Sequence, residues 1–278
     1  MNKQLQQQGI PLVLTLVTFG ILCSLVALAI WLLNLLPVAQ KIALVIRWPD
    51  VLVGLTIYLK TSIDFAIFIG NLMHANPGWQ KRIAIEIGTA AGNALGTIGI
   101  LIIWNFFREV PILMAIMIIL AAFVLLQMAE ESFEELQETN KMPGFLGRQV
   151  KTMKYLLHIP NKTVAPLLRL ITPEASLTNM KPLPWGRLLF FSATIPFILG
   201  LDDFAGYIPL FSVVNVFGFS VGVLLGHMIL NAALFISPKR TVVIVRNPWI
   251  LLIGGIAFVG IAGWGFVEVF KLIGEMLH

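Results

Sequence analysis

Long apolar runs separated by short polar stretches dominate the chain. A helix that crosses a bilayer needs about 20 mostly apolar residues. Seven stretches meet this criterion, at residues 11–36, 49–74, 83–104, 110–129, 187–211, 213–236 and 248–273. These runs are continuous, whereas the strands of a membrane barrel are short and alternate between apolar and polar residues. The pattern therefore predicts an all-α, polytopic membrane protein with about seven transmembrane helices.

The composition strengthens this prediction. Of the 278 residues, 58% are hydrophobic and 12% are charged, whereas about 25% are charged in a typical soluble domain. The net charge of +5 is carried by residues between the apolar runs, which favours orientation in a membrane over a nucleic-acid partner. Cys23 is the single cysteine, so an internal disulfide and a cysteine metal cluster are excluded. We expect a lipid bilayer as partner, no nucleic acid and no cofactor.

Lysine and arginine residues gather on one predicted side of the membrane. With seven spans, that side holds the N-terminus, the long loop over residues 130–186 and the loops after the second and sixth spans. The opposite side carries only Lys41, Arg47, Arg108 and Lys271. Because cytoplasmic loops are enriched in Lys and Arg, we expect an integral, multi-pass protein with its N-terminus in the cytoplasm and its C-terminus outside.

An internal repeat relates the second, third and fourth predicted helices to the fifth, sixth and seventh. Three short matches recur in the same order, 134 to 139 residues apart. They pair residues 63–66 with 202–205, Gly88 and Gly92-Asn93 with Gly222 and Gly226-His227, and 108–113 with 246–251. Because each unit has an odd number of helices, the two units have opposite orientations. The pattern is that of a transporter with a three-plus-three inverted repeat and an extra N-terminal helix.

The predicted spans divide the chain into four parts. Residues 1–48 hold the N-terminal transmembrane helix and a loop, and residues 49–129 form the first three-helix repeat. Residues 130–186 form a cytoplasmic loop, and residues 187–278 form the second three-helix repeat.

The cytoplasmic loop contains two charged segments. Five glutamates are expected to extend the fourth helix into water: Glu130, Glu131, Glu134, Glu135 and Glu138. Residues 145–157 place apolar side chains near one helical face and basic side chains largely opposite, which suits a short helix on an anionic leaflet. A plain linker and a partner-docking helix stay open. The prolines of this loop predict the end of any longer helix: Pro160, Pro166, Pro173, Pro182 and Pro184.

Acidic residues inside the spans are the first candidates for function. A charge at the bilayer centre costs about 3 kcal/mol on insertion scales. Asp64 and Asp203 occupy matched positions of the repeat, and Asp202 directly precedes Asp203. Lys60 lies four residues before Asp64, so a structural ion pair is the alternative for this acid. We expect Asp64 and Asp203 to line one cation site, with Asp202 beside them.

A shared site requires the helices to bend or break. Asp64 and Asp203 lie about fifteen and sixteen residues into helices of opposite orientation. Unbroken helices would hold the two carboxylates at depths about 15 Å apart. Pro196, Pro209 and Gly200 predict a break in the fifth span, which would let the two acids meet near a pseudo-twofold axis.

Three further polar residues are second-rank members of the metal or cation site. Glu86 is near the cytoplasmic end of the third span and has an alternative position at the membrane interface, which its side chain can reach. His227 is near the middle of the sixth span, where it suits a metal ligand, a proton carrier or a simple interhelical contact. Asn93 belongs to the third span and has interhelical hydrogen bonding as its alternative role.

The two triplets, each opening with an intramembrane acid, resemble the lysine-exporter superfamily, and within it the TerC-type tellurium-resistance and cadmium-resistance branches. The resemblance covers about residues 49–273. It implies that Asp64 and Asp203 form the transport site and that Asp202 completes the acid pair of the cadmium type. Two motifs differ from the family pattern: Asp64 is followed by Phe65 rather than Asn, and Gly200 stands where the cadmium type has Asn.

These observations favour a secondary transporter for a cation over an enzyme. We expect the cation to be a divalent metal, and exchange for protons stays open as the coupling. Carboxylates suit hard divalent cations, and export is implied by the resemblance alone. One alternative is a non-transporting assembly or scaffold subunit that docks partners through residues 130–186. The other is an intramembrane enzyme that uses Asp202, Asp203 and His227. A homo-oligomer stays open in each case.

Overall fold

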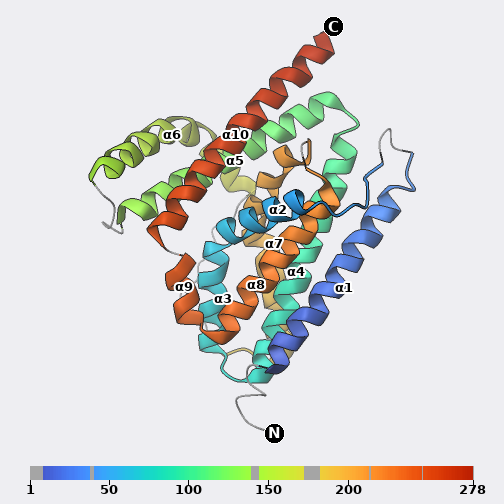
Figure 1. The fold of residues 1–278 in the computed structure, drawn as a ribbon, viewed down its shortest axis with the longest axis vertical. Helices are drawn as coiled ribbons and strands as arrows, with labels where there is room; N and C mark the ends of the chain where they lie inside the picture. Colours follow the sequence, from blue (N-terminus) through green and yellow to red (C-terminus); the bar gives the residue numbers. More distant parts are fainter. Residues whose placement is uncertain are drawn as a thin grey trace. The chain divides into compact units, whose positions relative to one another are not determined.

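In the computed structural model the chain is almost entirely helical. The structure describes residues 9–37, 41–138, 144–171, 182–212, 214–245 and 247–277, and these ranges contain no strand. The helices are α1 (Ile10–Leu33), α2 (Trp48–Thr61), α3 (Ile63–Ala75), α4 (Trp79–Phe107), α5 (Pro111–Glu138), α6 (Gly144–Ile171), α7 (Trp185–Tyr207), the 3-10 helix η2 (Ile208–Ser212), α8 (Val216–Ile236), α9 (Pro238–Val245) and α10 (Pro248–Leu277) (Figure 1). The predicted all-α class is confirmed.

Within the described ranges, five helices are long and apolar enough to cross a membrane: α1, α4, α5, α8 and α10. They coincide with the first, third, fourth, sixth and seventh predicted spans, and they make the chain a polytopic membrane protein. The fifth predicted span corresponds to α7 and η2. Many of the α7 side chains lie outside the described part, so the count of seven spans stays a prediction.

The predicted single helix over residues 49–74 is wrong. The segment contains two helices that meet at Ser62, whose φ of −84° and ψ of 22° leave the helical region, and the chain changes direction there (Figure 1). Thr61 and Ser62 favour this break because hydroxyl side chains compete for backbone hydrogen bonds; the Thr61 hydroxyl donates to the Tyr58 carbonyl. Neither half is long enough to cross about 30 Å of hydrocarbon on its own.

The predicted break in the fifth span is wrong at Pro196 and Gly200, and near Pro209 the α-helix changes to a 3-10 helix. Helix α7 continues through Pro196 and Gly200 to Tyr207, and Pro209 falls in the following 3-10 helix. A proline can stay inside a membrane helix, because neighbouring groups and small adjustments satisfy the carbonyl that it leaves free. A break before the matched acid therefore occurs in the first repeat, before Asp64, and not in the second, before Asp203.

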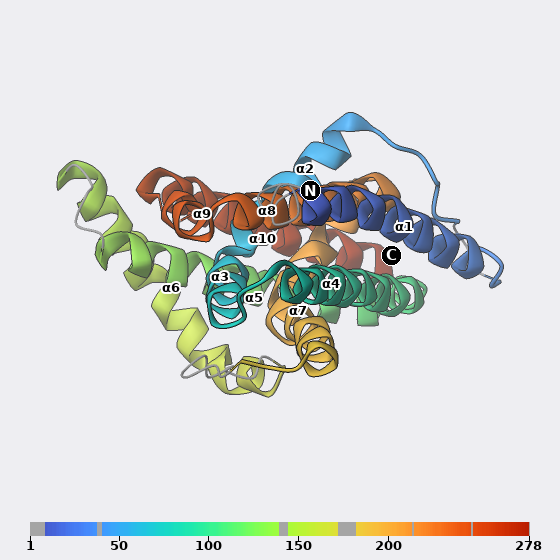
Figure 2. The same ribbon diagram turned by 90° about the horizontal axis from the view of Figure 1, so that it is seen from below.

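The chain folds as two compact units. The first comprises Met1–Ile102, Glu174–Leu201 and Val214–Val245, and the second comprises Ile103–Pro173, Asp202–Val213 and Arg246–His278. In the first unit α1 runs beside α8, as Figure 2 also shows. It buries Leu22, Val26 and Ile30 and exposes much of its other side, as expected for a helix that faces lipid.

Two interfaces in the first unit depend on glycine. On α8, a Cβ added at Gly222 would lie under 3.0 Å from the Val51 backbone, and one at Gly226 would meet the Tyr58 side chain of α2 at 2.8 Å. Higher positions on α8 meet higher positions on α2, so these two helices are parallel. The small residues let the backbones approach closely, as in other membrane helix pairs.

Helix α4 packs against α7 in the same way. A Cβ added at Gly88 would come under 3.0 Å from the Leu189 carbonyl oxygen, and one at Gly92 would come closer still to the Ala193 carbonyl oxygen. This pair is also parallel. We refer to α2 with α8, and α7 with α4, as the two glycine interfaces.

In the second unit α5 and α10 form an antiparallel pair. The Phe133 ring occupies the space beside Gly255, and ten residues earlier the Phe123 ring packs edge-on against Phe266 at 5.6 Å between centroids. The prediction that the glutamates extend the fourth span is confirmed, because α5 continues to Glu138.

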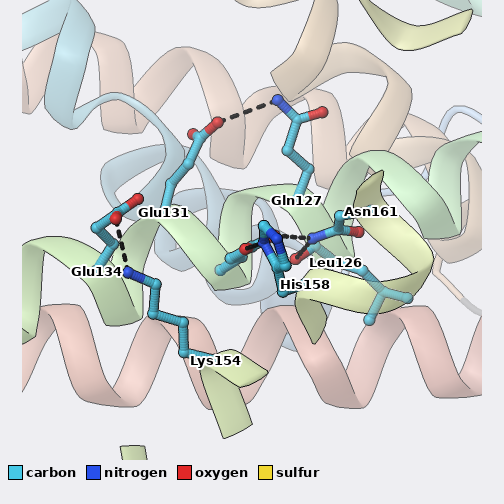
Figure 3. Close-up of polar contacts among 8 residues, drawn as sticks. Leu126, Gln127, Glu131, Glu134, Lys154, His158 and Asn161 are labelled. Carbon is cyan, nitrogen blue, oxygen red and sulfur yellow. Dashed lines mark hydrogen bonds and ion pairs between the residues drawn. The ribbon is translucent and has the colours of Figure 1, made fainter. Parts of the chain in front are cut away.

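Helix α6 runs back along α5. Lys154 Nζ lies 2.6 Å from Glu134 Oε1, and Asn161 Nδ2 donates to the Leu126 carbonyl at 3.1 Å (Figure 3). Val150 and Leu157 are buried, so the apolar face expected to lie on a leaflet packs against α5 instead. The predicted end of the helix near Pro160 and Pro166 is wrong, because α6 continues to Ile171.

Candidate functional site

Two rows of buried polar side chains lie in the first unit, one on α4 and one on α8. The α4 row consists of Glu86, Thr89, Asn93 and Thr97, and the α8 row of Ser220, His227 and Asn231. Spacings of three, four and seven residues place each row on one helical face. Buried polar groups in a membrane helix default to functional candidates.

A chain of hydrogen bonds joins α2, α8 and α4. The Tyr58 hydroxyl lies 2.8 Å from Nδ1 of His227, and Nε2 of His227 lies 2.9 Å from Nδ2 of Asn231. The same Asn231 nitrogen donates to the Thr89 hydroxyl oxygen at 3.3 Å. Thr89 in turn donates its hydrogen to the Ile85 carbonyl at 2.8 Å. Three helices are thus held together through side chains that are almost fully buried.

This chain of bonds accounts for both ring nitrogens of His227. With the amide nitrogen of Asn231 as donor, Nε2 is the acceptor and Nδ1 carries the hydrogen, which it donates to the Tyr58 oxygen. The assignment follows from the orientation of the Asn231 amide. The ring also packs against Phe65 at 5.9 Å between centroids. In this arrangement neither nitrogen has a lone pair available to a metal, and His227 bridges Tyr58 and Asn231.

The Glu86 carboxylate lies beside this chain of hydrogen bonds and is enclosed by protein. Its residue is 1% exposed. The side chains of Thr15, Asn231 and Thr18 are close enough to influence the carboxylate, yet neither oxygen has a hydrogen bond of normal geometry within the described part of the chain. The side chain is therefore buried among helices, and its depth in the membrane stays a prediction.

No cation neutralises Glu86 among the side chains that the structure describes. Arg82 lies one turn earlier on α4, but its guanidinium donates to the Phe235 carbonyl at 3.2 Å, and Glu86 forms no salt bridge there. Burying a carboxylate without a partner is costly, since water no longer stabilises the charge. The site can therefore accept a positive charge.

The remaining predicted site residues are placed only in part. Asn93 is 2% exposed and lies two turns from Glu86 on the same face of α4. Asp64 is the second residue of α3, directly after the helix break, and Asp202 and Asp203 belong to the last turns of α7. The side chains of these three aspartates and of Lys60 lie outside the described part of the chain. The predicted meeting of Asp64 and Asp203, which belong to different units, stays a prediction.

Among the described side chains, no group of three or more His, Cys, Asp or Glu residues could hold a metal ion. The polar cluster around Glu86 is instead made of one carboxylate and neutral groups. Sequence reasoning missed Tyr58, Thr89, Thr15 and Thr18 as members of this cluster, because a hydroxyl inside an apolar run carries no distinctive signal.

One signal in the sequence does mark the two polar rows. Three α4 residues and three α8 residues correspond at a constant separation of 134 positions: Glu86 with Ser220, Asn93 with His227, and Thr97 with Asn231. The glycine pairs Gly88 with Gly222 and Gly92 with Gly226 have the same separation. The correspondence between the middle helices of the two proposed repeats therefore includes polar positions as well as the glycines.

Comparison of the chain with protein-family models, with curated proteins and with solved structures found no match. The resemblance to the lysine-exporter superfamily accordingly stays a prediction from the motifs.

Proposed function

We propose that the protein is a secondary transporter that moves a cation across a membrane, coupled to the movement of a second ion such as the proton, by means of two oppositely oriented three-helix repeats. The observation that carries this proposal is the pairing of helices at the two glycine interfaces. The first repeat consists of α2 with α3, α4 and α5, and the second consists of α7, α8 and α10.

At each glycine interface, the first helix of one proposed repeat packs against the middle helix of the other. Helix α2 opens the first repeat and packs on α8, the middle helix of the second, where it meets Gly222 and Gly226. Helix α7 opens the second repeat and packs on α4, the middle helix of the first, where it meets Gly88 and Gly92. A twofold pseudo-axis between the proposed repeats would exchange these two helix pairs, and the matched glycines lie at both interfaces. Inverted repeats of this kind support alternating access in transporters.

The third helices of the proposed repeats fit the same scheme. Helices α5 and α10 pack on each other in an antiparallel pair, which is the arrangement of two helices that a twofold axis exchanges. The break at Ser62 adds a second feature of transporters, namely a discontinuous helix beside an intramembrane acid.

The proposed cargo follows from Asp64 and Asp203, whose carboxylates suit a divalent cation. The resemblance to metal-resistance transporters supports the same cargo. The alternative of an assembly subunit makes the opposite prediction for permeability, since such a subunit leaves the membrane closed to ions.

Reconstitution of the purified protein into liposomes tests the proposal. Uptake of Mn²⁺, Ca²⁺ and Mg²⁺ is measured with an imposed pH gradient, without one, and with protein-free liposomes as the control. We expect uptake of at least one of these ions, with proton movement in the opposite direction if the proton is the second ion. Liposomes that stay impermeable to every cation tested, with protein that remains folded, would favour the assembly subunit.

A further inference from the structure

Glu86 lies in a site made by three helices. Thr15 and Thr18 come from α1, Asn231 comes from α8, and Glu86 itself is on α4. Each of these residues is about one and a half to two turns from the nearer end of its own helix, so the site is at a similar distance from the end of all three helices. The α1 helix, expected as a mere addition to the repeats, thus supplies two hydroxyl groups that face the carboxylate.

The neutral side chains around Glu86 supply oxygen atoms for a bound cation and are held in place by hydrogen bonds. The Thr18 hydroxyl donates its hydrogen to the Leu14 carbonyl at 2.8 Å, which leaves its oxygen lone pairs free to face a cation. The Asn231 amide is held between His227 and Thr89, so it cannot turn without breaking two buried hydrogen bonds. Tyr58 holds His227 in turn. These residues position the site, and Glu86 supplies its charge.

Charge balance decides which ligand the site suits. One carboxylate faces two hydroxyls and an amide, and Arg82, one turn earlier on α4, is bound to the Phe235 carbonyl. A single positive charge would neutralise this site, whereas a divalent ion would leave one charge uncompensated in a buried position.

We propose that Glu86 is the binding site of the coupling ion of the transporter, a single positive charge supplied by a proton or by Na⁺, and that this site is separate from the aspartates. The coupling role of Glu86 rests on the proposed function, whereas the binding of an ion at Glu86 does not. Occupation of the site neutralises Glu86 and removes the cost of carrying a bare carboxylate between helices that move during transport.

Labelling of the wild-type protein with a hydrophobic carbodiimide tests the binding site directly. The O–H of a protonated carboxyl group in apolar surroundings adds across one C=N bond of the reagent: the proton goes to nitrogen and the carboxyl oxygen bonds to carbon. An O-to-N acyl shift then gives a stable N-acylurea, which mass spectrometry locates. We expect modification of Glu86. If Na⁺ is the ligand, Na⁺ but not choline protects Glu86 at constant pH. If the proton is the ligand, Na⁺ has no effect and labelling falls as the pH rises.

The outcomes that overturn the proposal are equally specific. A monovalent site at Glu86 is excluded if the reagent never modifies Glu86, or if the modification is independent of both Na⁺ and pH. It is also excluded if only divalent ions protect Glu86. Glu86→Gln removes the charge and keeps the shape, and Glu134→Gln is the matched control, because Glu134 is exposed on α5 and paired with Lys154. Because the labelling uses the wild-type chain, the test holds even if Glu86→Gln does not fold.

Transport assays then separate this proposal from the proposed function. Suppose that the wild-type protein transports cations and that uptake by Glu86→Gln depends on pH and Na⁺ as in the wild type. The proposed coupling role of Glu86 is then wrong, and the proposed transport function is supported. If Glu86 shows ion-dependent protection but no cation enters the liposomes, the proposed ion-binding site is supported and the proposed transport function is wrong. We expect cation uptake by Glu86→Gln to lose its dependence on the coupling ion, and uptake by Glu134→Gln to keep it.

Discussion

The Tyr58 hydroxyl and the imidazole of His227 form a buried hydrogen bond of 2.8 Å that joins residues 169 positions apart. Gly226 lies directly before His227 and leaves room for the Tyr58 ring against α8. The bond therefore connects the α2 segment before the helix break to the polar cluster around Glu86. The contact packs α2 against α8, and its hydrogen bond also holds His227, which in turn holds Asn231 beside the candidate ion site.

Tyr58→Phe removes this hydroxyl and keeps the ring. We expect the variant to lose about 1–3 kcal/mol of stability, because the His227 nitrogen is left buried without its partner. Thermal unfolding of the purified protein in detergent measures the loss. Tyr155→Phe is the matched control, because Tyr155 is 69% exposed and its substitution should leave the midpoint unchanged. Equal midpoints for both variants and the wild type would contradict the hydrogen bond.

Alanine at the glycine interfaces should separate the two helices of each pair. Gly222→Ala and Gly92→Ala each place a methyl group against a backbone carbonyl, and overpacking of this kind costs about 1–3 kcal/mol or more. Gly99→Ala is the control on α4, since nothing lies within 4 Å of its added Cβ. We expect lower thermal stability and lost uptake in the first two variants, with the control unaffected. Three equally stable variants would show that the helices do not approach as described.

The Lys and Arg bias predicts the topology. In a variant that lacks Cys23, single cysteines at Lys151 and Lys239 should react with an impermeant thiol reagent from the cytoplasmic side alone. A cysteine at Met276, which is exposed near the end of α10, should react from the outside. Labelling of right-side-out and inverted membrane vesicles measures each accessibility. Reaction of all three positions from one face would rule out seven spans.

Neutral substitution of the aspartates tests the cargo site. Asp64→Asn and Asp203→Asn should each abolish cation flux and leave folded protein in the membrane, because an amide keeps the shape and removes the charge that a cation needs. Lys60→Met should have a milder effect if its pairing with Asp64 is not structural. Uptake into liposomes is the measurement, with size-exclusion chromatography as the check of folding. Normal uptake by both asparagine variants would place the cargo site elsewhere.

The helices that the sequence predicts well are those whose apolar length alone determines the outcome. Helices α1, α4, α5, α8 and α10 follow from runs of about 20 apolar residues, because such a run is stable in lipid whatever it packs against. The break at Ser62 is different. Thr61 and Ser62 are an unremarkable pair inside an apolar run, and contacts with other helices decide whether such a pair stays helical.

The same distinction applies to the candidate site. Glu86 and His227 stand out in the sequence because charged and imidazole groups are rare in spans. Their hydrogen-bonding neighbours Thr15, Tyr58 and Thr89 do not, since threonine and tyrosine are tolerated anywhere in a membrane helix. Only the three-dimensional packing of α1, α2 and α4 around α8 selects these hydroxyls from the others.

The exchange of partners at the glycine interfaces sets an order of events during synthesis. Once Tyr58 has been made, the ribosome must add 169 residues before its partner His227 exists, a delay of roughly 10–30 s at about 5–20 residues per second. Throughout this interval the first repeat is in the membrane without the helices that cover its glycines. We therefore expect the insertion machinery or a membrane chaperone to shelter α2 and α4 during synthesis, and we expect a chain truncated after α5 to be degraded faster than the full chain.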